Sequence, residues 1–277
     1  MDLRNRIVVI TGGGGGIGKA MASAFIERGA RVVLADIARD RAEAAAAELG
    51  EGCFAAQLDV TSASDWASLK NWTEQQLGPV DILCCNAGVG HSAPLDAPDL
   101  RGFRWVHEVN LLGPLMGLET FLPGMKERGA GHIVFSCSIT ALRPVPGQSA
   151  YSSSKAALAN VALTLEQELR GTGVGVSALM PGMVITELRA NSDEAWAEKN
   201  GSVAAPAAAT SVLAAGMPAE AVGRAVSDAV ADGRFWIFPH DGYQPALARE
   251  AQLALEAMAL SPMPEHRDPA VLLEPMH

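Results

Sequence analysis

A tyrosine and a lysine four positions apart, Tyr151 and Lys155, are the residues of this sequence best suited to chemistry. Both lie in a segment of helical composition, where positions i and i+4 project from one face toward the same space. A phenol with a pKa of about 10 is a poor base at neutral pH, but a nearby ammonium group favours the phenolate and is expected to lower that pKa. The pair is therefore a candidate for general acid and base chemistry, although such pairs are also common on helix surfaces.

Ser138 is the next candidate, because it follows an apolar run at 132–136 that is typical of a buried strand. Its hydroxyl is expected to hydrogen-bond the substrate oxygen and to stabilise the charge that develops there. A serine beside an apolar strand is more often a core or capping residue, so this prediction depends on Tyr151.

Glycine dominates the segment from Thr11 to Gly18, which follows an apolar run at 6–10 and opens a helical segment at Ile17. A turn without side chains lets a pyrophosphate approach backbone N–H groups and the positive end of the helix dipole. A flexible turn would have the same composition, but the strand before it and the helix after it favour a dinucleotide site.

Asp36 ends the next apolar run, 31–35, eighteen residues beyond Gly18. A carboxylate at this position can accept hydrogen bonds from both hydroxyl groups of an adenosine ribose, and it would repel a 2′-phosphate. We therefore expect NAD(H) in preference to NADP(H), although Arg39 and Arg41 lie close enough to leave NADP(H) open. The alternative for Asp36 is a helix cap or a solvated loop carboxylate.

Alternating short apolar runs and longer Ala-rich segments must position these residues. We expect strands at 6–10, 31–35, 53–58, 80–85, 132–136, 174–179 and 235–238, and helices at 17–28, 39–49, 62–77, 99–128, 151–170 and 218–231. This order predicts one α/β domain, with a doubly wound parallel sheet of the Rossmann type between two layers of helices. Ligands of such sheets lie at the carboxyl ends of the strands, so residues that follow the strands should form the site.

Two segments depart from this alternation. Residues 186–217 are rich in Ala, Ser, Asn and Gly with little periodicity, which predicts a lid over the substrate site. We assign residues 1–243, including this lid, to the sheet domain. Residues 244–277 are expected to form an amphipathic helix at 244–260 and an irregular tail, packed on the same domain or on a neighbouring subunit.

The composition argues against several classes of protein. The formal net charge is -10 and the 21 basic residues form no run, which disfavours a nucleic-acid partner. No apolar window is long enough to span a bilayer and no secretory leader is visible, so we expect a cytoplasmic protein. The cysteines have no CxxC spacing and the six histidines no HExxH pattern. We expect no disulfide, no metal, and buried thiols at Cys53, Cys84, Cys85 and Cys137.

Taken together, these motifs resemble the short-chain dehydrogenase/reductase family over about residues 5–240. The family's TGxxxGxG motif is similar to Thr11 through Gly18, its catalytic Ser to Ser138, and its YxxxK pair to Tyr151 and Lys155. Further motifs of the family have counterparts here. Its Asp-Val is similar to Asp59-Val60, its NAG to Asn86-Ala87-Gly88, its helix-borne Asn to Asn110, and its Pro-Gly with a downstream Thr to Pro181-Gly182 and Thr186. The family often has Ser-Ser where this chain has Cys137-Ser138, and the segment beyond Asp241 departs from the family's short ending.

The resemblance implies an NAD(H)-dependent oxidoreductase that interconverts a secondary alcohol and its ketone. It implies four catalytic residues, Asn110, Ser138, Tyr151 and Lys155, with Asn110 anchoring a proton-relay water and Lys155 also holding the nicotinamide ribose. The implied cofactor contacts are Gly12, Gly16, Ile17, Gly18, Asp36, Ile37, Asp59, Val60, Asn86, Ala87, Gly88, Tyr151, Lys155, Pro181, Gly182, Val184 and Thr186. It also implies homodimers or homotetramers that pair through the helices at 99–128 and 151–170.

The substrate is less defined than the reaction. Residues 139–142 carry no charge, which favours a neutral, rather apolar secondary alcohol or ketone, with Arg143 as the exception. His91 is expected either to line the substrate pocket or to be a solvated loop residue. Apolar walls or core positions are expected for Met183, Val184 and Trp196. Two other functions remain open: an epimerase or dehydratase that retains NAD, and a non-catalytic nucleotide-binding protein on the same fold.

Overall fold

The computed structural model describes residues 1–200 and 216–259, and the chain divides after His240 into two units. The strands of the first unit are β1 (Ile7–Thr11), β2 (Arg31–Asp36), β3 (Cys53–Gln57), β4 (Ile82–Cys85), β5 (Gly131–Ser136), β6 (Val174–Leu179) and β7 (Trp236–Ile237). Its longer helices are α1 (Gly16–Ile26), α2 (Arg39–Leu49), α3 (Ala63–Gln76), α4 (Leu100–His107), α5 (Gly113–Arg128), α6 (Ser149–Glu168), α7 (Leu188–Asn200) and α8 (Ala219–Asp232).

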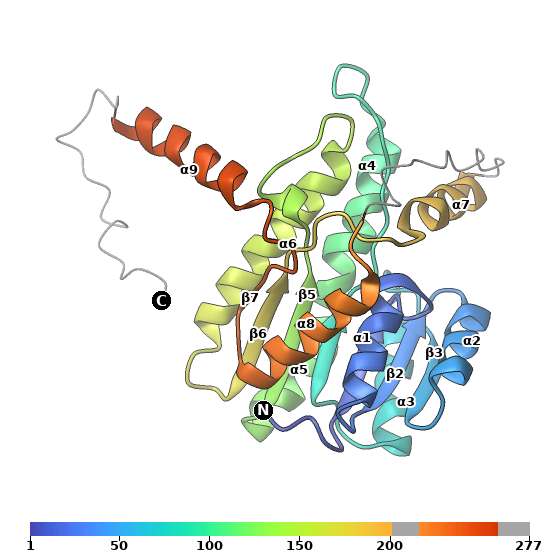
Figure 1. The fold of residues 1–277 in the computed structure, drawn as a ribbon. Coiled ribbons are helices and arrows are strands. Elements are labelled where there is room, and N and C mark those ends of the chain that lie inside the picture. The colour runs from blue at the N-terminus through green and yellow to red at the C-terminus, as the bar shows by residue number, and fades with distance from the viewer. Residues whose placement is uncertain (201–215, 260–277) are drawn as a thin grey trace. The chain divides into compact units, whose positions relative to one another are not determined.

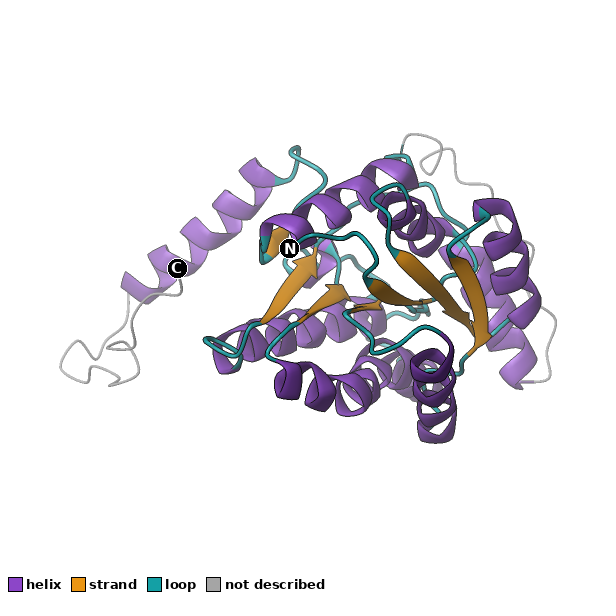
Figure 2. Ribbon diagram, turned by 90° about the horizontal axis from the view of Figure 1, so that it is seen from below, coloured by secondary structure: helices purple, strands orange, loops and turns teal. Residues whose placement is uncertain are grey.

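These strands form one parallel sheet in the order β3-β2-β1-β4-β5-β6-β7. The chain changes direction across the sheet between β1 and β4, where Val8 pairs with Ile82 and Ile10 with Cys84. Figure 2 shows the strands as the middle layer, with helices on both of its faces. The expected doubly wound α/β fold of the Rossmann type is therefore confirmed, and its ligand crevice is expected beyond the carboxyl ends of β1 and β4.

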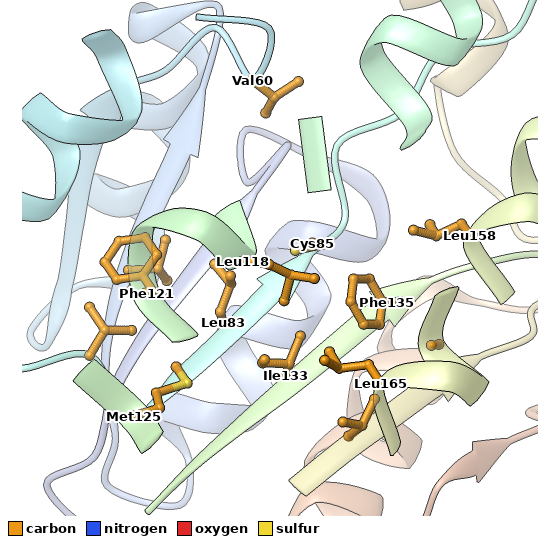
Figure 3. Close-up of a cluster of buried hydrophobic side chains, with 14 of the residues drawn as sticks. Val60, Leu83, Cys85, Leu118, Phe121, Met125, Ile133, Phe135, Leu158 and Leu165 are labelled. Carbon is orange, nitrogen blue, oxygen red and sulfur yellow. The ribbon is translucent and has the colours of Figure 1, made fainter. Parts of the chain in front are cut away.

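A separate hydrophobic core covers each face of the sheet. On one face, Leu83, Ile133 and Phe135 of the strands pack against Phe121 and Met125 of α5, with α3 and α6 completing the layer (Figure 3). Each such side chain contributes roughly 1.5–3 kcal/mol when it is fully buried. On the other face α1, α2 and α8 cover the strands, and α1 lies beside α8 (Figure 1).

The contact between α1 and α8 depends on one glycine. A Cβ at Gly223 of α8 would lie 2.3 Å from the carbonyl oxygen of Ala20 in α1. No larger residue fits there without moving one helix away from the other, so Gly223 sets the distance between the two helices.

The helix expected at 99–128 is interrupted in the structure. α4 ends at His107 and is followed by a π-helical turn, η1 (Glu108–Leu112), before α5 begins. Pro114 lies in the first turn of α5 and has no N–H, so it cannot donate a hydrogen bond to the π-helical turn before it. π-helical turns are frequent at functional sites, and this one carries Asn110.

The segment expected as a lid, 186–217, contains a helix that its composition did not predict. This helix, α7, packs through Ala195 and Trp196 against Trp105 and Val106 of α4. Its apolar residues are few, so its position depends on these tertiary contacts and not on a periodic pattern. Residues 201–215 of the expected lid lie outside the described residues.

In the second unit, α9 (Gln244–Ala259) forms where the amphipathic pattern predicted a helix, and the expected tail beyond it lies outside the described residues. Across the part of the chain that the structure describes, no helix combines the length and the apolar character needed to cross a bilayer.

Candidate active site

Ser138, Tyr151 and Lys155 lie together beyond the carboxyl end of β5. Tyr151 is in the first turn of α6 and Lys155 one turn later, with its Nζ 5.7 Å from the centre of the Tyr151 ring. Ser138 caps a short helix, η2 (Ile139–Ala141), and hydrogen-bonds the Tyr151 side chain. The Ser138 hydroxyl is itself held by Thr140, whose backbone N–H and side-chain hydroxyl donate to it at 3.2 and 3.0 Å. The fold thus brings these three predicted side chains into one group.

Burial raises the pKa of Tyr151 to about 12, and the hydrogen bond to Ser138 offsets only part of this increase. The Lys155 ammonium by itself therefore does not lower the pKa of the phenol, and the lowering expected from an oxidised nicotinamide together with this ammonium stays a prediction. The physical reason is that a buried phenolate loses its solvation, while the Lys155 ammonium donates at 2.6 Å to the backbone carbonyl of Ser136. Burial also lowers the pKa of Lys155 to about 8. A phenol with this pKa keeps its proton at neutral pH.

Asn110 connects α6 with the loop after β4. Its buried amide accepts a hydrogen bond from the Val89 N–H at 2.8 Å, and it donates to the Val89 carbonyl at 2.9 Å and to the Ser154 hydroxyl at 3.0 Å. Both amide hydrogens are used in this way. A Cβ at Gly88 would lie 3.4 Å from both Asn110 Oδ1 and Lys155 Nζ, so the two side chains converge at that glycine.

The glycine turn between β1 and α1 is tightly packed on one side and open on the other. A Cβ at Gly12, where φ is +63°, would lie 2.9 Å from the Ala87 Cα, and one at Gly18 would lie 2.3 Å from the Gly12 carbonyl oxygen. At Gly15, by contrast, no atom lies within 4 Å of the Cβ position. α1 begins here without a side-chain cap, which leaves its first N–H groups for a ligand. This cradle fits the pyrophosphate of a dinucleotide.

Asn86 fastens the glycine turn to the neighbouring strands. Its Nδ2 donates to the Thr11 carbonyl at 3.0 Å, and its Oδ1 accepts from the Ser136 hydroxyl at 3.1 Å. The backbone N–H groups of Asn86 and Ala87 both donate to Thr11 Oγ1, at 3.0 and 2.9 Å. The NAG stretch therefore joins the ends of β1, β4 and β5 at the position where a cofactor would cross the sheet.

Asp36 is a buried carboxylate at the end of β2, not a solvated loop residue. Its Oδ2 accepts the Gly14 N–H at 3.0 Å, and its Oδ1 accepts the Ala38 N–H at 3.1 Å and lies 3.8 Å from the Arg41 guanidinium. The carboxylate thus joins the glycine turn to the start of α2 and retains capacity for ribose hydroxyl groups. Ile37, the next residue, leaves an apolar side chain exposed beside it.

The loop after β6 reaches the same edge of the sheet. A Cβ at Gly16 would lie 3.1 Å from Thr186 Cγ2, which places Thr186 against the glycine turn. The Pro181 carbonyl accepts the Ile139 N–H at 2.9 Å and so connects this loop with η2 beside Ser138. Val184 is buried in the hydrophobic core, so it does not form an exposed apolar wall.

Three further predicted cofactor contacts have clear structural surroundings. Asp59 Oδ1 accepts from the Thr61 N–H at 2.8 Å and from its hydroxyl at 2.7 Å, which stabilises the turn after β3. Val60 is buried, and a Cβ at Gly113 would lie 2.9 Å from its side chain. Ile17 is partly buried against the core under α1.

His240 is a residue that sequence reasoning missed. Its imidazole holds the turn after β6, because Nδ1 accepts the Gly182 N–H at 3.1 Å and Nε2 lies 3.0 Å from the Met183 carbonyl oxygen. Since Nδ1 accepts, Nε2 carries the hydrogen and donates it. The available signal was position alone, since His240 follows the last strand at the edge where ligands bind.

A cavity of about 130 Å³ opens beside Tyr151. Its lining comes from the loop after β4, from the residues before α6 and from α7: Gly90, His91, Ser92, Gln148, Tyr151, Leu188, Arg189, Ser192 and Asp193. His91 therefore lines the pocket, and the Trp196 ring packs behind it with 4.7 Å between ring centres. The lining carries more charge than residues 139–142 suggested, because α7 brings charged side chains from a distant part of the sequence.

The cysteines and the metal-ligating side chains of the described residues lie as follows. Among the residues described, no three His, Cys, Asp or Glu side chains lie together in a way that could hold a metal ion. Cys84, Cys85 and Cys137 are buried free thiols, as expected, whereas Cys53 is only partly buried.

Comparisons with known proteins agree with this geometry. A family model for short chain dehydrogenases matches residues 6–197. A short chain dehydrogenase of Pseudocercospora fijiensis is 39% identical over 197 residues, which cover 69% of this chain and 64% of that protein. The 1-deoxy-11-beta-hydroxypentalenate dehydrogenase of Streptomyces exfoliatus is 38% identical over 194 residues, covering 68% of this chain and 70% of that protein. A crystal structure of a Burkholderia phymatum short chain dehydrogenase/reductase in complex with NAD superimposes with a TM-score of 0.83 and 27% identity, covering 92% of this chain and 96% of the other.

Proposed function

The chain belongs to the short-chain dehydrogenase/reductase family of oxidoreductases, and on this basis we propose that it interconverts a secondary alcohol and its ketone with NAD(H) as cofactor. The observation that carries the proposal is the grouping of Ser138, Tyr151 and Lys155 at the same edge of the sheet as the glycine turn and Asp36. The S. exfoliatus relative is named as a dehydrogenase of a hydroxylated compound, which supports an alcohol as the substrate here.

Tyr151 transfers the proton in this mechanism. During reduction its hydroxyl donates a proton to the carbonyl oxygen while a hydride reaches the carbonyl carbon, and during oxidation its phenolate accepts the proton of the alcohol. Ser138, which hydrogen-bonds Tyr151, holds the substrate oxygen within reach. Because burial favours the neutral phenol, oxidation requires groups that stabilise the phenolate. The Lys155 ammonium is such a group, with its Nζ 5.7 Å from the ring centre.

The residues around the glycine turn fit a bound dinucleotide. The open side of the turn at Gly15 would receive the pyrophosphate, Asp36 the adenosine ribose, Lys155 the nicotinamide ribose and Thr186 the carboxamide. When bound, NAD⁺ would supply the hydride acceptor and a positive charge that favours the Tyr151 phenolate. The buried Asp36 carboxylate supports NAD(H) over NADP(H), because a 2′-phosphate would be repelled.

Asn110 supports this chemistry as a positioning residue. Its side chain is fully engaged with Val89 and Ser154, so a proton-relay water would bind to its backbone carbonyl in η1 and not to its amide. Through Ser154, the same side chain fixes α6 between Tyr151 and Lys155.

The surroundings of the cavity support a neutral substrate with a largely apolar body. Leu188 is an exposed apolar side chain of the cavity lining, and Leu142, Val145 and Met183 are further exposed apolar side chains of the chain. We propose that the lid segment 186–217, through its described helix α7, covers this substrate.

The exposed Leu112 at the end of η1 and Leu115 in the first turn of α5 support pairing of subunits through this helix.

The free thiols support a reducing compartment such as the cytoplasm.

A single substitution tests the proposed function. Tyr151→Phe should fold and bind NADH, yet lose a factor of about 10²–10⁴ or more in turnover of a secondary alcohol with NAD⁺, measured by the absorbance of NADH. Tyr243→Phe removes the same hydroxyl group from the other tyrosine of the chain and serves as the control. Near-normal turnover in Tyr151→Phe would contradict the proposal. Epimerised or dehydrated product without release of NADH would favour the NAD-retaining alternative.

A further inference from the structure

We propose that His91 is a specificity-determining residue, which accepts a hydrogen bond from a second hydroxyl group of the substrate, and that Asp99 positions it. The inference rests on the proposed function, because it concerns the alcohol that Tyr151 deprotonates. His91 and Tyr151 line the same cavity, so a substrate in contact with Tyr151 is within the space that His91 borders.

The His91 imidazole is held on three sides, by Asp99 and Gly102 nearby in the sequence and by Trp196 far along the chain. Its Nε2 lies 2.9 Å from Asp99 Oδ2, and its ring centre lies 4.7 Å from that of Trp196 in α7. A Cβ at Gly102 would lie 2.2 Å from His91 Cδ2, so the ring packs directly on the backbone of α4. Only 16% of the side chain is exposed, which distinguishes His91 from a solvated loop histidine.

Asp99 determines which nitrogen of the ring is available to a ligand. Its Oδ1 accepts the N–H groups of Arg101 and Gly102 at 3.0 and 3.2 Å, and its Oδ2 is left for His91. The hydrogen bond from the Gly102 N–H is the main reason that the pKa of Asp99 is below its usual value, so the group is a carboxylate that only accepts. Nε2 of His91 therefore donates to it. In the neutral imidazole, Nδ1 is then an acceptor, and none of the described residues hydrogen-bonds it.

Three other polar residues of the cavity, all in α7, are less able to select a substrate. The Ser192 hydroxyl already accepts the Gly90 N–H at 2.9 Å and donates to the Leu188 carbonyl at 2.6 Å. Arg189 Nε and Asp193 Oδ2 are 4.0 Å apart, and 61% and 43% of the two side chains are exposed. Solvent therefore screens both charges. His91 is the most rigidly held of these groups, and its acceptor has a defined position.

The size of the cavity suggests the probes. Its volume of about 130 Å³ is similar to that of an engineered cavity of about 150 Å³ that holds benzene, so a six-membered ring is a suitable test body. One hydrogen bond between neutral groups changes kcat/KM by roughly 2- to 10-fold. Cyclohexanol, the 1,2-, 1,3- and 1,4-cyclohexanediols and their monomethyl ethers cover several spacings between the reacting and the second oxygen.

The experiment measures kcat/KM for oxidation of these alcohols by NAD⁺. The wild-type protein should prefer at least one diol over cyclohexanol, and also over the matching ether, which keeps the acceptor oxygen but lacks the donor. In His91→Phe, which keeps a ring against Trp196 but has no nitrogen, the ratio of diol to cyclohexanol should fall by roughly 2- to 10-fold. A diol has two hydroxyl groups that can react, which raises its kcat/KM in the wild type and in the variant alike. This advantage cancels when the ratio of diol to cyclohexanol is compared between the two proteins.

Asp99→Asn tests the positioning role without removing the helix cap, because asparagine caps helices as well as aspartate does. Asp99→Asn should also lower the ratio of kcat/KM for the diol to kcat/KM for cyclohexanol. Asp96→Asn removes an exposed carboxylate from the same loop and should leave the ratio unchanged. If His91→Phe does not fold, the comparison of these two variants decides the question.

Equal use of diols and cyclohexanol by the wild type would overturn the role of His91, and so would an unchanged ratio in both His91→Phe and Asp99→Asn. A preference for the ether over the diol would also overturn it, because His91 would then donate and not accept. In each of these cases alcohol oxidation itself would leave the proposed function in place. Failure of every alcohol to yield NADH would instead overturn the proposed function, and the inference with it.

Discussion

Replacement of His132 by glutamine should make the fold less sensitive to mild acid. His132 is buried in β5, and its Nε2 lies 2.8 Å from Ser177 Oγ in β6, while the Ser177 hydroxyl donates to the Arg234 carbonyl at 2.6 Å. A Cβ at Gly175 would lie 2.5 Å from His132 Nδ1, so the ring is enclosed on that side as well. Burial lowers the pKa of His132 to about 4 from its usual value of 6.5.

The sign and size of the effect follow from this difference in pKa. Below pH 6.5 the unfolded chain binds a proton at His132 while the folded protein does not, so the free energy of unfolding falls as the pH decreases toward 4. Above pH 6.5 His132 is neutral in both the folded and the unfolded protein, so none of this free energy of unfolding is lost. Each pKa unit corresponds to about 1.4 kcal/mol, which gives a loss of about 2 kcal/mol between pH 6.5 and pH 5 and about 3 kcal/mol by pH 4.

Urea unfolding at pH 7 and at pH 5, at one protein concentration, measures this contribution. Glutamine can place its Nε2 near the position of the imidazole Nε2 and donate to Ser177, but it does not titrate. Between the two pH values the wild type should lose about 2 kcal/mol more stability than His132→Gln, and the other titrating groups cancel in this difference. Equal losses in the two proteins would refute the account of His132 as a buried neutral histidine.

Two other predictions concern the cofactor and the helix contact. Asp36→Ser should raise the ratio of kcat/KM for NADP⁺ to kcat/KM for NAD⁺ by about 10- to 100-fold. The substitution removes the carboxylate that would repel a 2′-phosphate, and it frees the Arg41 guanidinium, which lies 3.8 Å from that carboxylate, to bind the phosphate. An unchanged ratio would show that Asp36 does not select the cofactor. Gly223→Ala should destabilise the fold by about 1–3 kcal/mol in urea unfolding, since its Cβ would meet the Ala20 carbonyl oxygen at 2.3 Å. The matched change Gly124→Ala in α5 meets only the flexible end of Arg128 and should be neutral or stabilising, so similar losses in both variants would argue against close packing of α1 on α8.

Local patterns in the sequence were sufficient for the fold and for the grouping of Ser138, Tyr151 and Lys155. Short apolar runs predicted the strands, and the glycine turn after the first strand predicted the cofactor cradle, because both signals arise within a few residues. Tyr151 and Lys155 needed only helical periodicity to share a face. The helix at 99–128 was predicted as continuous because a π-helical turn has no clear sequence signature.

The sequence by itself therefore determined which strands and helices form the sheet domain and that Ser138, Tyr151 and Lys155 follow the same edge of the sheet, because these signals are local. Only the tertiary structure decided the pKa of Tyr151, because that value depends on burial by residues far apart in the chain. It also decided the packing of Trp196 on His91, the surroundings of His240 and the place of α7, since these contacts join segments separated by many tens of residues. Short-range composition does not encode such long-range contacts or the loss of solvation that accompanies them.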